Sequence, residues 1–126
     1  MLQQAQAAMR STGVALDRVQ PGSENVSLCH GHPGNAELFV VAREVLARRP
    51  APMPAGPWAT VPERAANFVD ERYLRRRLPC PAGIPTREES PCLLLGNAGL
   101  GYFFLRLFDP TRTPSVLLPV PRPELA

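Results

Sequence analysis

Two adjacent residues, Cys29 and His30, are the pair in this sequence best suited to chemistry. A thiolate and a neutral imidazole are both strong zinc ligands, and the following Gly31 would relieve crowding around a metal. Spacing alone does not separate this interpretation from a buried cysteine beside a loop histidine. Two adjacent ligands also leave at least one protein ligand to be found. The pair is therefore a candidate part of a metal site.

The other residues that could complete such a site are His32, Cys80 and Cys92. None has the C-x-x-C or H-x-x-x-H spacing of a self-contained structural zinc site. We expect His32 to face solvent in a loop, Cys80 to lie in a loop between two prolines, and Cys92 to act as a small buried hydrophobe. A structural zinc site made of Cys29, His30 and Cys92, completed by Cys80, is the hypothesis they leave open.

Several other kinds of site are not supported by the sequence. Both histidines fall in one loop, so no Ser-His-Asp arrangement can be assembled, and no Gly-rich loop ends in Lys-Ser or Lys-Thr. The glycines of Gly96-x-x-Gly99-x-Gly101 follow no β-α-β pattern, which a dinucleotide fingerprint requires. We therefore assign no catalytic residue and no nucleotide site to this chain.

Composition limits the size and the partners of the protein. The chain has 126 residues and 44% hydrophobic content, enough for one small domain. Its 14 basic residues are all arginine and give a net charge of only +3. They cluster at Arg48–Arg49 and Arg75–Arg77, at predicted helix C-termini, where positive charge is favourable. Without interleaved aromatic residues they indicate solvated helix ends, so no nucleic-acid partner is expected.

The sequence has no export signal and no membrane-spanning segment. Its longest uncharged stretch, Ser90–Leu105, is shorter than a bilayer span. Three cysteines without an export signal predict reduced thiols rather than a disulfide framework. We expect a soluble, cytoplasmic protein.

Four helices separated by Pro- and Gly-rich loops are predicted, so the fold class is all-α. Thr60 and Glu63 form a capping-box pattern before the third helix, and the fourth is apolar enough to be buried on most sides. The predicted helices cover residues 2–10, with a less certain continuation to 18 because of Gly13, and about 35–49, 61–78 and 97–108.

Two glycine motifs introduce the apolar helices. Gly31-His-Pro-Gly34 and Gly96-Asn-Ala-Gly99 lie 65 residues apart, with an amphipathic helix between them. Glycine at a helix entrance allows close backbone packing, and the recurrence indicates a repeat in which inner and outer helices alternate. Two unrelated glycine turns are the alternative.

Two segments resemble the end of the lanthionine synthetase C-like family. They are SLCHGHPGNAEL at 27–38 and PCLLLGNAGLGYFFLRLFDPTRTPSVLLP at 91–119. The continuation Gly34-Asn-Ala-Glu-Leu38 is most similar to the cyclase domain of the bifunctional class II enzymes called LanM. The resemblance covers about residues 5–120, so we expect residues 1–126 to be the C-terminal part of such a cyclase domain.

The resemblance implies an α/α toroid of paired helices, of which this chain would form the last hairpins. It also implies that Cys29 and His30 bind zinc. In the family, zinc activates a cysteine thiol of a precursor peptide, which adds to dehydroalanine or dehydrobutyrine to form a thioether ring in a lanthipeptide, or lantibiotic.

The family's other zinc-binding cysteine and its proton-handling histidine have no counterpart in this sequence. We therefore expect a fragment in which zinc binding is weak or absent without the rest of the cyclase. The expected partners are the precursor peptide and the rest of the cyclase or a dehydratase domain. A non-catalytic remnant that binds a peptide or a partner protein is the alternative.

Overall fold

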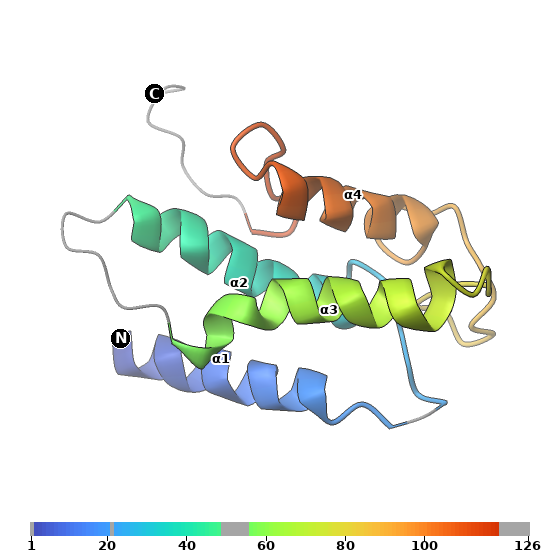
Figure 1. Cartoon of the computed structure of the whole chain (residues 1–126), viewed down its shortest axis with the longest axis horizontal. Coiled ribbons are helices and arrows are strands. Elements are labelled where there is room, and N and C mark those ends of the chain that lie inside the picture. Colours follow the sequence, from blue (N-terminus) through green and yellow to red (C-terminus); the bar gives the residue numbers. More distant parts are fainter. Residues whose placement is uncertain (1, 21, 49–55, 119–126) are drawn as a thin grey trace.

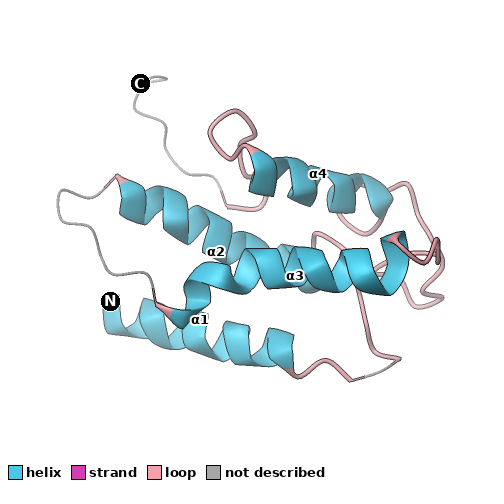
Figure 2. Ribbon diagram, in the orientation of Figure 1, coloured by secondary structure: helices cyan, strands magenta, loops and turns pink. Residues whose placement is uncertain are grey.

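The computed structural model describes residues 2–20, 22–48 and 56–118, and it is helical, with no strand in these ranges. The four helices are α1 (Leu2–Asp17), α2 (His32–Ala47), α3 (Val61–Val69) and α4 (Asn97–Phe108). A 3₁₀ turn (Pro57–Thr60) precedes α3, and a π-helical turn (Asp70–Leu74) extends it (Figure 1). The all-α prediction with four helices is confirmed (Figure 2).

Helix α2 is the centre of the molecule, since it contacts each of the other three helices. It begins three residues earlier than predicted, because Pro33 suits the first helical turn. Its buried side combines with α3 and α4 in one core, to which Leu16 at the end of α1 adds. The buried members of that core are Leu28, Ala36, Val40, Ala65, Ala66 and Phe103.

Helix α1 continues through Gly13 to Asp17, beyond the predicted end at residue 10. A Cβ atom at Gly13 would be in ordinary contact, 3.8 Å from the ring of Phe39, so this side of α1 lies against the core. Tertiary packing therefore outweighs the cost of about 1 kcal/mol for a glycine within a helix.

The capping box predicted before α3 does not form. Thr60 is the residue that precedes the helix, but its side chain makes no capping hydrogen bond. The carboxylate of Glu63 instead accepts a hydrogen bond of 2.7 Å from Arg43 on α2. The helical segment also ends at Leu74 rather than near Leu78, followed by Arg77 in the left-handed region at φ 54°.

Helix α4 has the predicted bounds, but the expectation that most of it is buried is wrong. Phe103 is fully buried, whereas Leu105 is 57% and Phe108 89% exposed. One side of α4 packs on the core and the other is open. Across the described ranges, no helix is both long enough and apolar enough to cross a membrane.

Candidate metal centre

A tight loop before α2 holds Cys29 and His30. The amide of Ser27 donates to Oδ1 of Asn25 at 2.8 Å, and the amide of His32 donates to the Asn25 carbonyl at 2.8 Å. The amide of Cys29 donates to the carbonyl of Leu94 at 2.8 Å, which ties this loop to the one before α4. The backbone at the pair is thus fixed from both sides.

Two glycines allow this loop to close on the helix. A Cβ atom at Gly34 would overlap the carbonyl group of Leu28, and one at Gly31 would overlap the backbone of Asn25 and Ser27. Neither glycine has a positive φ, so the requirement is steric rather than conformational. The predicted role of the Gly-x-x-Gly motif in close packing is confirmed at these positions.

The side chains of Cys29 and His30 are both exposed, so the pair is open to a ligand from solvent. The imidazole of His30 lies against Gly83, where an added Cβ atom would be 2.9 Å from Cε1. A cavity of about 150 Å³ opens beside His30, between the end of α1 and the start of α2. An exposed thiol and an exposed imidazole on adjacent residues are a suitable donor pair for zinc.

No third donor completes this pair within the described ranges. No group of three or more His, Cys, Asp or Glu side chains there could hold a metal ion. The residues therefore fit two positions of a zinc site and not a closed structural site. The hypothesis of a structural zinc site formed by Cys29, His30, Cys92 and Cys80 is not supported. The assignment of Cys29 and His30 as ligands stays a prediction.

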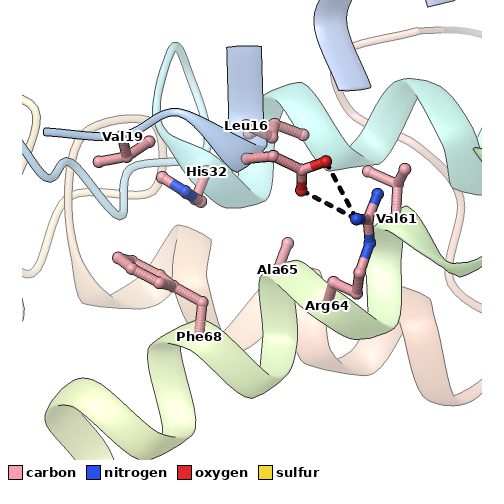
Figure 3. A pocket seen from close by; sticks show the side chains of 8 residues that line it. Leu16, Val19, His32, Val61, Arg64, Ala65 and Phe68 are labelled. Atoms are coloured by element: carbon pink, nitrogen blue, oxygen red, sulfur yellow. Dashed lines mark hydrogen bonds and ion pairs between the residues drawn. The ribbon is translucent and has the colours of Figure 1, made fainter. Parts of the chain in front are cut away.

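His32 is buried, at 6% exposure, which corrects the expectation that it faces solvent. Its ring stacks on Phe68 with centroids 4.3 Å apart and planes 9° from parallel. Burial lowers the pKa of the imidazole below its usual value. His32 and Phe68 both line a cavity of about 250 Å³ (Figure 3), which the ion pair of Arg64 with Asp17 also borders.

The two other cysteines differ in environment. Cys80 is buried, and burial followed by the nearby Glu89 raises the pKa of its thiol. Cys92 is exposed, which shows that the prediction of a buried hydrophobe was wrong. Hydrogen bonds from the backbone amides of Leu95 and Leu94 lower the pKa of the Cys92 thiol. Sequence reasoning gave no signal for this, because the exposure depends on what the loop packs against.

The predicted repeat is present in the hydrogen bonding of the two glycine loops. Gly31 and Gly96 each have an extended backbone conformation, and each immediately precedes a helix. Four backbone amides of the first loop donate hydrogen bonds, and their counterparts 65 residues later donate to the equivalent acceptors of the second loop. The donor pairs are Ser27 and Cys92, Gly31 and Gly96, His32 and Asn97, and Asn35 and Leu100. The second loop has Leu94 and Leu95 in the places of Cys29 and His30. The fold is thus repeated, while the donor pair occurs once.

A protein-family model described as lanthionine synthetase C-like protein matches residues 3–118. The match contains both glycine loops and all of α2, α3 and α4. No curated protein and no solved structure matches the sequence.

Proposed function

Because this chain belongs to the lanthionine synthetase C-like family, we propose that it is the C-terminal part of a zinc-dependent lanthionine cyclase. In this proposal Cys29 and His30 are two of the three protein ligands of the zinc. The observation that carries it is the placement of the pair: both side chains are exposed, His30 borders an open cavity, and the glycine loop holds their backbone in place.

The chemistry of the donor pair suits the reaction of the family. When bound, zinc supplies Lewis acidity that lowers the pKa of a peptide cysteine thiol, whose sulfur then adds to the β-carbon of dehydroalanine or dehydrobutyrine. The roles of this chain are to bind and to orient: Cys29 donates sulfur, His30 donates nitrogen, and Gly83 leaves room for the imidazole. We assign it no proton-transferring residue.

The rest of the cyclase would supply the third ligand and the proton-handling histidine. It would lie next to the cavity beside His30, where the ends of α1 and of the loop meet. Two ligands alone should bind zinc weakly, because affinity depends on a complete and oriented ligand set. The sequence of the Gly34–Leu38 segment favours a class II, LanM-type parent with a dehydratase domain. The exposed free thiols of Cys29 and Cys92 favour the cytoplasm, where thiols stay reduced.

A second candidate function is a non-catalytic remnant that binds a peptide or a partner protein. The lack of a third metal donor among the described residues favours it, together with the open side of α4 at Leu105 and Phe108.

Zinc protection of the thiols from alkylation tests the proposed ligands. Zinc should slow the reaction of Cys29 with iodoacetamide while the exposed Cys92 reacts as before, so Cys92 is a control within the same molecule. His30→Ala should remove the protection. Equal protection of Cys29 and Cys92, or protection that survives His30→Ala, would contradict the assignment.

Complementation separates the two candidate functions. The chain is added to a class II cyclase truncated before its own Cys-His-Gly motif, with a dehydrated precursor peptide as substrate. Ring formation that returns with the wild-type chain and not with Cys29→Ala supports the cyclase part. Binding to the truncated enzyme or to the peptide without any ring formation supports the remnant.

A further inference from the structure

The second glycine loop accepts backbone hydrogen bonds at the two places where the first loop has its donor pair. The amide of Cys29 donates to the carbonyl of Leu94 at 2.8 Å, and the amide of Gly83 donates to the carbonyl of Leu95 at 2.8 Å. In the repeat, Leu94 and Leu95 are the counterparts of Cys29 and His30. The second loop therefore has no donor side chains at these places, but the carbonyls of both hold other parts of the chain.

A short segment, Pro81–Gly83, connects the two glycine loops, and we call it the bridging segment. At its start, the amide of Val26 donates to the carbonyl of Pro81 at 3.1 Å. At its end, Gly83 is bonded to Leu95 of the second loop. The first two residues of the segment are buried. The bridging segment is thus fixed at both ends and has little freedom to shift.

The α-carbon of Gly83 lies between the side chains of Ser27 and His30. A Cβ atom at Gly83 would be 2.7 Å from Oγ and 2.9 Å from Cβ of Ser27, and 2.9 Å from Cε1 of His30. Ser27 is fully buried, whereas His30 is exposed. Because Cε1 lies between the two ring nitrogens, a contact at this atom restricts the direction in which either nitrogen can point.

We propose that the second glycine loop supports the donor pair: Leu94 holds the backbone of Cys29 directly, and Leu95 holds the imidazole of His30 through Gly83. Gly83 is then a positioning residue for a zinc ligand, and this role rests on the proposed function. The backbone of an exposed histidine leaves its side-chain torsions free. Contact with the bridging segment removes part of that freedom before the metal binds, which favours binding.

Gly83→Ala tests the contact in the protein without metal. Because the chain has only 2 histidines, a carbon–proton NMR spectrum of the imidazoles has two Cε1–Hε1 signals, which His30→Ala assigns. The new methyl group should move the signal of His30, since Ser27 is buried and the exposed ring is freer to move. The signal of His32, which stacks on Phe68, should stay in place.

Zinc protection of Cys29 from iodoacetamide tests what the contact does for the metal. Gly83→Ala should raise the zinc concentration that protects half of Cys29 by about tenfold or more, as expected when a group that orients a metal ligand is disturbed. Labelling of Cys92 should not change. Gly101→Ala is the matched control, because it adds the same methyl group with no atom within 4 Å, and it should leave the zinc concentration unchanged.

Ser27→Gly in the Gly83→Ala chain is a rescue. It removes two of the three close contacts of the new Cβ atom, so the bridging segment can move towards residue 27 and release the imidazole of His30. The zinc concentration for half protection of Cys29 should then return towards the wild-type value. A double variant that binds zinc no better than Gly83→Ala alone overturns the proposal.

The remaining outcomes separate the support from zinc binding itself. A wild-type chain that zinc does not protect overturns the assignment of Cys29 and His30 as ligands, and the support with it. Equal protection of wild type and Gly83→Ala overturns the support alone and leaves the two ligands in place. Movement of both histidine signals, with a loss of helix content by circular dichroism, also overturns it, because Gly83 would then hold the fold rather than the ring.

Discussion

Arg106 on α4 and Glu37 on α2 form an ion pair inside the core, with Nε of Arg106 donating to Oε1 of Glu37 at 2.9 Å. Their side chains are 1% and 2% exposed. Arg106 also binds Glu44 at 2.7 Å and the carbonyls of Pro110 and Thr113. Burial alone would lower the pKa of the guanidinium, but Glu44 and Glu37 raise it above its usual value. One residue thus joins α2, α4 and the following segment.

Arg106→Met should destabilise the protein by about 3–5 kcal/mol, because it leaves the buried charge of Glu37 without a partner. Urea unfolding of the monomer would measure the change. Glu37→Gln in the same chain should recover part of the loss, since the unpaired charge is then absent. Arg112→Met is the control: Arg112 is 88% exposed, and its removal should cause no measurable change.

Glu24 should make the free energy of unfolding decrease as the pH falls into the acid range. Its side chain is buried, and its Oε1 accepts a hydrogen bond of 2.6 Å from Arg72. The backbone amides of Glu24 and Gly22 and the Arg72 guanidinium lower the pKa of the carboxyl, against the opposing effect of burial. A lowered pKa means that the stabilisation is present above the unfolded value of about 4.3 and is lost as the pH falls through the folded value.

Glu24→Gln should therefore lower the free energy of unfolding by about 1–3 kcal/mol at pH 7, with a smaller difference from wild type at pH 3. Urea unfolding at a series of pH values measures this. Glu63→Gln is the matched control, because Glu63 is also paired with an arginine but its side chain is 49% exposed, so the change should stay below about 1 kcal/mol. A Glu24→Gln effect that does not vary with pH would contradict the proposed role of the charge.

Local signals were sufficient to predict that four helices form and where two of them lie. The glycine motif and apolar run of α4 gave its bounds as observed, and the glycine loop and apolar run of α2 gave that helix to within a few residues. The recurrence of Gly31 and Gly96 predicted a repeat that the loop hydrogen bonds reproduce. These features depend on steric and hydrogen-bonding rules that act over a few residues.

The environment of single side chains could not be predicted in the same way. His32 is buried because Phe68, on a different helix, stacks on it, and Arg106 is buried because Glu37 lies 69 positions earlier in the chain. Such pairs depend on which helices meet, which local pattern does not encode. Cys29 and His30 were recognisable as possible zinc donors from residue type alone, and this assignment stays a prediction, since no third donor joins them among the described residues.

The three thiols should react at different rates in the native protein. Cys29 and Cys92 are exposed and Cys80 is buried with a raised pKa, so iodoacetamide near pH 8 should label the first two and spare the third. Mass spectrometry of the labelled peptides measures each site. In urea Cys80 should react as well. Rapid labelling of Cys80 without denaturant would show that the loop around it opens far more readily than its packing indicates.

Gly34 and Gly101 should respond to alanine in opposite directions. In Gly34→Ala, the new Cβ atom would overlap the Leu28 carbonyl, so the loop that carries Cys29 must shift away from α2, at a cost of about 1–3 kcal/mol. Gly101 lies in α4 with no atom within 4 Å of an added Cβ, so Gly101→Ala should stabilise the helix by about 0.5–1 kcal/mol. Urea unfolding at low protein concentration measures both. Because the overlap lies at the carbonyl of Leu28, next to Cys29 in the chain, the Gly34 variant should also change the alkylation rate of Cys29. Equal stability of the two variants would mean that the glycine loop does not need its close approach to the helix.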